Sequence, residues 1–405
     1  MYEKYIEENV NLILYNGTTY MAKDLTINQY LMGSDNTAKK IIKIDIVFSE
    51  GYILNIKSKS RKFPILETFN VHEKSVMSFK YSGSPRIYQR NEKQYVVMYF
   101  NVCVENGYNK VYIKSKSFSY GKNKNKAYKS AQIFKNDVSS EFIYPLHDDS
   151  IGNYVNYPKH FLSRLYLHKA PIHFFPLIYD IDIDPYLLGL WLGDGTSKKA
   201  CITNIDKEVI DYLYNIACKL DCKITKYDIS YSFSGIQRGK NKFLKFLQEY
   251  DLFGNKHVPR EYIYTTVEER LSLLAGFIDT DGSLGKDRYY EILQKSDLIT
   301  EGIVFIARSL GFYVSNNKTV KKWTHKGEKK QQTYNHINIC TTPIINISSI
   351  PVLIERKIKK NRSNPPKNLN HYAFELIKDN CEKKFYKITI EGSDHTVLTN
   401  SFMVI

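Results

Sequence analysis

Two aspartates that end similar apolar strings are the residues of this sequence best suited to chemistry. Asp194 ends LLGLWLGD in residues 187–195 and Asp281 ends LAGFIDTD in residues 274–282, and a glycine follows each acid. Each string predicts a short buried helix, in which a C-terminal carboxylate faces the negative end of the helix dipole, at a cost of up to roughly 1 kcal/mol. The helix dipole alone would favour a lysine at this position. Because both strings have an acid there instead, we expect the two aspartates to bind a pair of divalent cations. For either string alone, the alternative is a buried helix with a glycine C-cap.

Small residues within the two strings indicate how the acids meet. Gly189 and Gly193 are one helical turn apart in the first string, and Gly276 and Thr280 have the same spacing in the second. Small side chains at this spacing allow two helix backbones to approach closely. We therefore expect the two helices to pack side by side.

The elements around the two strings repeat in order. The first string is followed by a predicted strand, a helix over residues 206–220 and a second strand, CKITKY. The second string is followed by YYEILQ, a helix over residues 297–310 and the strand GFYVSN. Duplication with pseudo-twofold symmetry explains this order.

The ends of the chain predict a second, discontinuous domain. Residues 9–79 and 385–405 consist of short alternating apolar runs separated by turns, a pattern typical of β structure. We therefore expect an α+β protein with an all-β domain at residues 1–165 and 370–405, which carries a basic insertion at about 80–165. A two-repeat α/β domain is expected at 175–365.

The charge balance favours a polyanionic partner. The 405 residues include 58 Lys and Arg against 42 Asp and Glu, which gives a net charge of +16. Nucleic acid is the first candidate and an anionic membrane surface the second. No run approaches the roughly 20 apolar residues that span a bilayer, and the first ten residues lack a signal-peptide core. The six cysteines lack zinc spacing, so we expect reduced thiols and an intracellular location.

A basic segment in residues 110–135 has eight lysines and no acid. Aromatic residues are interleaved, which favours a DNA-contacting arm over a solvated loop, although the loop stays open. The lysines that we expect to contact DNA are Lys110, Lys114, Lys116, Lys122, Lys124, Lys126 and Lys129.

The paired strings resemble the signature helices of single-chain LAGLIDADG homing endonucleases. The resemblance implies a monomer with internal symmetry that cleaves both strands of a long DNA target and leaves short 3′ overhangs. Mg²⁺, or Mn²⁺ in its place, is implied at a metal site formed by Asp194, Asp281, Gly193 and Thr280. By motif position, Lys256 and Lys360 are implied as catalytic lysines. Further DNA contacts are expected from Arg356, Lys357 and Arg362.

The flanking β segments resemble the Hint domain of protein-splicing inteins. His72 and His395 match its histidines, but the family's nucleophile falls near Tyr5, and no Cys, Ser or Thr occupies residues 1–11. We therefore expect a vestigial splicing fold in a freestanding enzyme, located in the nucleus if the source is a eukaryote. Two alternatives stay open, namely an intein with trimmed ends and a catalytically silent DNA-binding regulator.

Overall fold

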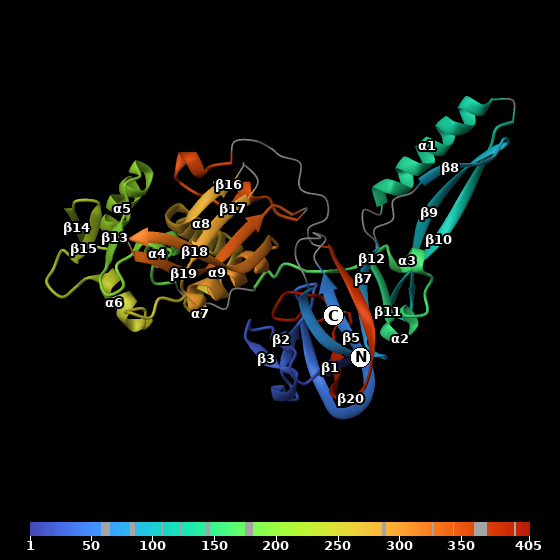
Figure 1. Cartoon of the computed structure of the whole chain (residues 1–405), viewed down its shortest axis with the longest axis horizontal. Helices are drawn as coiled ribbons and strands as arrows, with labels where there is room; N and C mark the ends of the chain where they lie inside the picture. Colours follow the sequence, from blue (N-terminus) through green and yellow to red (C-terminus); the bar gives the residue numbers. More distant parts are fainter. Residues whose placement is uncertain are drawn as a thin grey trace. The chain divides into compact units, whose positions relative to one another are not determined.

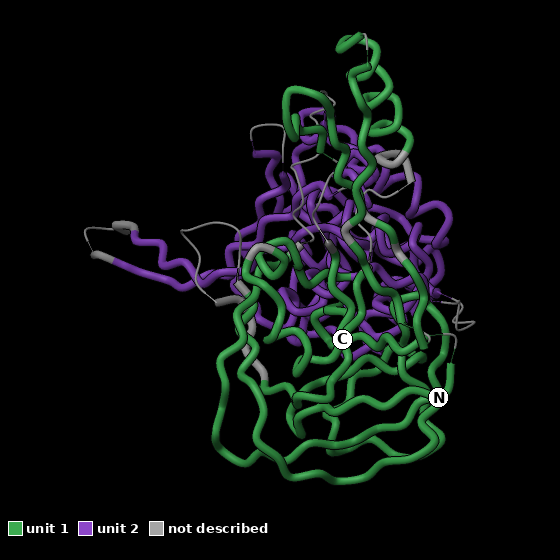
Figure 2. The backbone as a smooth tube through the Cα atoms, turned by 90° about the vertical axis from the view of Figure 1, so that its right-hand side faces the viewer, with its two compact units in different colours: residues 1–169, 371–405 green, residues 170–370 purple. Residues whose placement is uncertain are grey.

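The computed structural model divides the chain into two units (Figure 2). Unit 1 comprises residues 1–169 and 371–405, and unit 2 comprises residues 170–370. The structure describes residues 1–57, 65–81, 86–106, 108–121, 123–141, 146–174, 181–285, 289–325, 328–342, 344–359, 371–392 and 394–405. Both ends of the chain therefore belong to one unit, and the protein is a mixed α+β structure.

The main sheet of unit 1 has eight strands in the order β11-β7-β12-β20-β1-β6-β5-β4. Its longest members, β5 (Ala38–Lys57) and β20 (His371–Glu391), pair antiparallel and form a long curved ribbon (Figure 1). Alternate residues such as Ile388 and Ile390 are fully buried, as expected of strands with one face on a core. The other strands are β1 (Tyr2–Glu7), β4 (Tyr30–Met32), β6 (Ile65–His72), β7 (Val76–Tyr81), β11 (Leu146–Ser150) and β12 (Leu165–His168). Smaller elements are β2 (Asn11–Ile13), β3 (Thr19–Met21), α2 (Ile151–Tyr154) and α3 (Lys159–Leu162).

A separate three-stranded sheet carries the basic segment of unit 1. Its order is β10-β9-β8, from β8 (Arg86–Asn91), β9 (Gln94–Glu105) and β10 (Tyr108–Ser119). Helix α1 (Lys124–Glu141) runs along these strands (Figure 1). The described lysines of the basic segment therefore lie on a strand and a helix, and the loop interpretation was wrong for them.

Unit 2 contains two small sheets with related strand orders. In each, the strand that precedes the next long helix, β13 before α5 and β17 before α9, pairs with the second strand of the hairpin that follows that helix, β15 and β19 respectively. The first sheet consists of β13 (Cys201–Thr203), β15 (Ser230–Gly235) and β14 (Cys222–Tyr227). The second consists of β16 (Gly282–Gly285), β17 (Tyr289–Gln294), β19 (Glu328–Cys340) and β18 (Tyr313–His325).

The helices of unit 2 follow the predicted order. Helix α5 (Lys207–Lys219) separates β13 from β14, and α9 (Asp297–Ser309) separates β17 from β18. The remaining helices are α4 (Pro185–Asp194), α6 (Lys242–Glu249), α7 (Arg260–Ile263) and α8 (Val267–Asp281). Among the helices of the described ranges, none has the length and apolar character needed to cross a lipid bilayer.

Candidate active site

The first carboxylate is carried by α4. Asp184 is the N-cap of this helix and accepts a hydrogen bond from the backbone nitrogen of Tyr186 at 2.8 Å. Residues 186–192 are all buried, so every face of the helix packs against the rest of the protein. Its last residue, Asp194, is exposed. The core of unit 2 therefore fixes the position at which this carboxylate meets solvent.

The second carboxylate, Asp281, ends helix α8. Thr266 and Glu269 form a capping box at the start of the helix. The glycine that follows each acid is extended, with φ of −74° at Gly195 and −96° at Gly282. Gly195 and Gly282 are therefore the C-cap residues of their helices, as the alternative interpretation expects, but in an extended conformation and not in the left-handed one that glycine often adopts at this position. A Cβ at either glycine would instead lie under 3.0 Å from the carbonyl oxygen four residues earlier.

The two helices pack through their glycines, as the spacing predicts. A Cβ built on Gly189 would lie under 3.0 Å from the carbonyl oxygen of Leu273 on α8. A Cβ built on Gly276 would lie equally close to the carbonyl oxygen of Tyr186 on α4. The same contact is thus made twice with the roles of the helices exchanged. Only glycine permits this backbone approach, and it aligns the C-terminal ends of α4 and α8.

The residues next to the acids are also in contact. A Cβ built on Gly193 would lie under 3.0 Å from the Oγ1 atom of Thr280 and 3.5 Å from the Cγ atom of Asp281. The Asp281 carboxyl group therefore lies beside the residue that precedes Asp194. The Thr280 hydroxyl donates to carbonyl oxygens of its own helix, at 2.9 and 3.2 Å, and is turned back toward that helix.

The electrostatics show that the two carboxylates share one environment. Burial and, to a smaller extent, the negative charge of Asp194 raise the pKa of Asp281 to about 6 against the opposing effect of Lys256 and Lys357. Burial also raises the pKa of Asp194, although its side chain reaches solvent. Gln294 on β17 donates from Nε2 to Oδ2 of Asp281 at 2.8 Å.

Lys256 contacts the end of α4. Its Nζ donates to the carbonyl oxygens of Trp191 at 2.7 Å, Leu192 at 3.2 Å and Gly195 at 2.6 Å. The ammonium group also lies 4.6 Å from the centre of the Trp191 ring. Burial lowers the pKa of Lys256 to about 8, and the negative charges of the two aspartates oppose this shift. The structure therefore places this predicted residue beside both acids.

Lys357 holds the corresponding position at the end of α8. Its Nζ donates to the carbonyl oxygens of Ile278 at 2.9 Å and Asp279 at 2.8 Å. These carbonyls precede Asp281 by three and two residues, as Trp191 and Leu192 precede Asp194. The side chain is 7% exposed, so it lies inside the site and not on the outer surface where we had expected a DNA contact.

The other predicted residues near Lys357 divide into two groups. Lys360 and Arg362 lie outside the described residues. Arg356 is exposed, and its guanidinium group is paired with the carboxylate of Asp206, with 2.9 Å between Nη2 and Oδ2. Nothing in the basic sequence 356–362 distinguishes Lys357 from its neighbours, so sequence reasoning missed its role at the end of α8.

The lysines of the proposed arm differ in availability. Lys114, Lys116, Lys124, Lys126 and Lys129 are exposed, whereas Lys110 is paired with Asp149 at 2.8 Å. Lys122 lies outside the described residues.

The aromatic residues of the arm pack mostly against one another. The rings of Tyr120 and Tyr128 both contact Tyr95, and Phe118 contacts Phe134. They join α1 to the strands beneath it, and the exposed lysines surround this small core.

The two histidines expected from a splicing domain are both buried. His72 stacks on Tyr5 with 4.5 Å between ring centres, and its Nδ1 accepts a hydrogen bond from the backbone nitrogen of Lys74. His395 lies against the rings of Tyr2 and Tyr108, and burial lowers its pKa to about 2. Each imidazole is therefore enclosed by aromatic rings.

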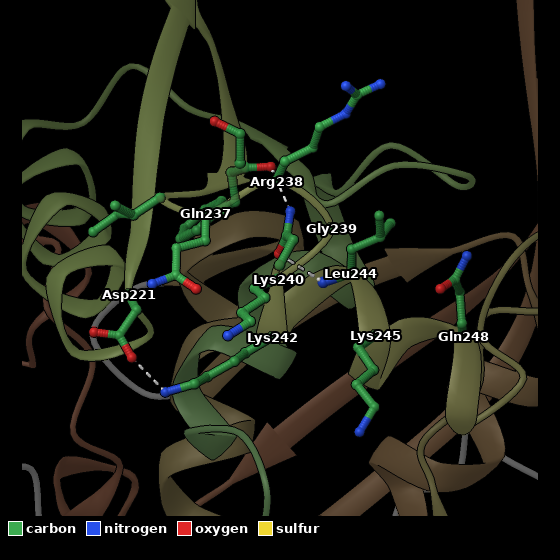
Figure 3. Close-up of a pocket in the computed structure, with 14 residues that line it drawn as sticks. Asp221, Gln237, Arg238, Gly239, Lys240, Lys242, Leu244, Lys245 and Gln248 are labelled. Carbon is green, nitrogen blue, oxygen red and sulfur yellow. Dashed lines mark hydrogen bonds and ion pairs between the residues drawn. The ribbon is translucent and has the colours of Figure 1, made fainter.

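A large groove of unit 2 lies apart from the carboxylates. It has a volume of about 1010 Å³ and is lined by residues from β15, α6 and the turn between them (Figure 3). Four of its side chains are basic, and two of these are paired, Lys242 with Asp221 at 2.6 Å and Lys245 with Glu249 at 3.2 Å. Arg238 and Lys240 are exposed in the turn. The groove is therefore a second positively charged surface.

The donor set of the site fits a hard divalent cation that keeps much of its water. Among the residues that the structure describes, no group of three or more His, Cys, Asp or Glu side chains is placed to hold a metal ion. The site offers the carboxylates of Asp194 and Asp281. Mg²⁺ prefers such oxygen ligands and keeps several waters in its coordination shell.

One family model matches a part of unit 2 that includes Asp281 and Lys357 but not Asp194 or Lys256. Residues 257–360 match the family model for homing endonucleases. The chain is similar to homing endonucleases. An alignment of 479 positions shows 22% identity to the homothallic switching endonuclease of Saccharomyces cerevisiae and covers 98% of this chain and 79% of that protein. A second alignment shows 35% identity over 102 residues to the replicative DNA helicase DnaB of Mycobacterium intracellulare, and covers 25% of this chain and 14% of that protein.

Proposed function

We propose that this chain is a site-specific DNA endonuclease of the homing type, which hydrolyses one phosphodiester bond in each strand of a duplex. The observation that carries the proposal is the pairing of Asp194 and Asp281 at the ends of two packed helices, each helix end with its own lysine. The similarity to homing endonucleases supports it.

Each side chain of the site has a distinct part in the reaction. Asp194 and Asp281 would hold Mg²⁺, or Mn²⁺ in its place, which when bound supplies positive charge to the scissile phosphate and lowers the pKa of water. Lys256, with a pKa of about 8, is divided between ammonium and amine near neutral pH. Its amine accepts a proton from the attacking water, and its ammonium form stabilises negative charge in the transition state.

Lys357 would act at the other strand, where its ammonium group stabilises negative charge in the transition state. It replaces Lys360 in our assignment, because its Nζ lies on the carbonyl oxygens that correspond to those of Lys256. Each strand is then cut by one aspartate and one lysine, and a break in both strands with a short 3′ overhang requires both pairs.

DNA binding would use both charged surfaces. The exposed lysines of β10 and α1 would neutralise phosphates on one part of a long target, and the strands of unit 2 would read base edges in the major groove. Arg238 and Lys240, in the groove of Figure 3, are candidates for phosphate contacts outside the cleavage centre.

We further propose that unit 1 is a vestigial splicing domain that now serves as a scaffold. Tyr5 lies near the position at which the splicing nucleophile is expected, and its ring covers His72. A phenol stacked on the imidazole supplies neither a thiol nor an aliphatic hydroxyl for attack on the peptide bond.

The experiment is cleavage of a plasmid library of random inserts by the purified chain with Mg²⁺, followed by sequencing of the cut ends. We expect cuts at a single long site with short 3′ overhangs, and no cuts in EDTA. Specific binding without nicking in either Mg²⁺ or Mn²⁺ would instead identify a DNA-binding regulator.

A further inference from the structure

The second half of the site contains a buried carboxylate that the first half lacks. Asp279 on α8 is 1% exposed, and the residue at the corresponding position of α4 is Leu192. Burial of an acid is unfavourable unless hydrogen bonds satisfy it. Asp279 therefore calls for an explanation other than helix packing, because leucine fills the same position in α4.

The hydrogen bonds of Asp279 reach two different segments. Its Oδ2 accepts from the hydroxyl group of Tyr186 on α4 at 2.6 Å and from the backbone nitrogen of Leu353 at 2.7 Å. Its Oδ1 is buried without a hydrogen-bond partner among the residues that the structure describes. Burial raises the pKa of this carboxyl group, and the hydrogen bonds from Tyr186 and Leu353 oppose the shift.

Leu353 is the first residue of a short segment, residues 353–357, that ends at Lys357. The backbone nitrogen of Lys357 donates to the carbonyl oxygen of Ile354 at 2.8 Å, and the Tyr290 hydroxyl donates to the carbonyl oxygen of Lys357 at 2.9 Å. The Nζ atom of Lys357 returns to the backbone oxygen of Asp279 at 2.8 Å. Asp279 thus contacts the segment at both ends, through its side chain at Leu353 and through its backbone at Lys357.

The first half of the site holds its lysine differently. Lys256 lies over the ring of Trp191, and its Nζ atom is within hydrogen-bond distance of four backbone oxygens near the end of α4. Lys357 has two such oxygens, and its helix has isoleucine where α4 has Trp191. Lys357 therefore has fewer hydrogen bonds of its own, and its position depends more on how its backbone segment is held.

We propose that Asp279 is the positioning residue for Lys357, and that the two strands of a target are therefore cut by half-sites of unequal construction. The consequence for cleavage rests on the proposed function, whereas the positioning itself does not. Asp279 acts by holding residues 353–357 against α8, and the Tyr186 hydroxyl ties α4 to the same carboxylate.

The positioning is tested on the protein alone by reductive methylation of lysines, measured residue by residue with mass spectrometry. Asp279→Leu, which copies the first helix, is expected to raise the rate at Lys357 about tenfold, with the rate at Lys256 unchanged. Asp279→Asn keeps an acceptor oxygen and is expected to stay within about twofold of the wild-type rate.

Leu192→Ala is the matched control for general loosening of the buried helices. It is expected to leave the Lys357 rate unchanged. An equal rise at Lys357 in this variant, or no rise in Asp279→Leu, would overturn the proposal. Should Asp279→Leu fail to fold, Leu353→Pro removes the backbone donor from a residue with an exposed side chain, and the same rise at Lys357 is expected.

Strand-resolved cleavage then tests the consequence. On the site that the wild-type chain cuts, Asp279→Leu is expected to slow one strand about tenfold or more and to leave the other strand and the DNA affinity unchanged, so that nicked product accumulates. Equal slowing of both strands would contradict unequal half-sites. If the wild-type chain cuts no DNA, the proposed function fails, whereas the methylation result still decides the positioning.

Discussion

Gly189 on α4 and Gly276 on α8 make the same backbone contact in opposite directions. Each leaves room for a carbonyl oxygen of the other helix, that of Leu273 in one case and that of Tyr186 in the other. This close approach brings Asp194 and Asp281 to one centre. The geometry of the site therefore depends on the lack of a side chain at these two glycines.

The first prediction concerns this approach. Gly276→Ala places a methyl group under 3.0 Å from a backbone oxygen that has little freedom to move, and we expect a loss of roughly 1–3 kcal/mol in the free energy of unfolding, measured by urea titration. Gly152→Ala is the control, because its nearest neighbour is 3.4 Å away. Equal stability of the two variants would contradict the packing described here.

A second prediction separates two lysines that lie close in sequence. Lys357→Met removes the ammonium group that lies on the last carbonyls of α8, and we expect cleavage of one strand to slow about a hundredfold or more with DNA affinity retained. Lys360→Met is expected to have a much smaller effect. The opposite order of the two effects in strand-resolved rates would restore Lys360 as the catalytic residue.

The third prediction concerns salt dependence. Neutralising Lys124, Lys126 and Lys129 together is expected to weaken DNA binding and to reduce the slope of log affinity against log salt, by up to about 0.9 for each phosphate that the variant no longer neutralises. Lys43 is also exposed but is paired with Asp45 at 2.8 Å, so Lys43→Gln serves as the control. An unchanged slope in the triple variant would remove the arm from the DNA interface.

Acid stability supplies a fourth prediction. Burial lowers the pKa of His147 to about 4 and that of His395 to about 2, from a value of 6.5 for an exposed histidine. Between pH 6.5 and 4 the unfolded chain therefore binds more protons than the folded chain, and stability falls as the pH falls through this window. Asp281, whose pKa is raised to about 6, opposes the trend within this window, and so does Asp148, because burial raises its pKa; the two histidines, with the larger shifts, set the net direction.

Scanning calorimetry of the wild-type chain from pH 7 to pH 4 measures this loss as a falling Tm. The double variant His147→Asn, His395→Asn is expected to start from a lower Tm and to lose less of it on acidification. A wild-type Tm that stays constant over this range would contradict the burial of neutral histidines.

Local periodicity predicted most of the elements of unit 2. The strands β14 (CKITKY) and β17 (YYEILQ) match their predicted sequences, and α5 and α9 end within a residue of the expected bounds. The paired glycines predicted the helix contact, because a close approach needs small residues at that spacing. These features depend on short stretches of sequence.

Contacts between distant segments could not be predicted in this way. Lys357 lies among other basic residues, and only the folded position of the α8 carbonyls distinguishes it. In the sequence, Asp279 is one residue of the second apolar string. Only the fold shows that it accepts a hydrogen bond from the backbone nitrogen of Leu353. In the basic segment, the lysines concealed a helix that packs on its neighbouring strands through an aromatic core.

The central claim is that Asp194 and Asp281 act together on one duplex. The most direct measurement is strand-resolved cleavage of the selected target in Mg²⁺ by Asp194→Asn and Asp281→Asn, with DNA affinity measured beside it. We predict that each variant binds as the wild-type chain does and yields no double-strand breaks. Double-strand cleavage at the wild-type rate by either variant would contradict the account.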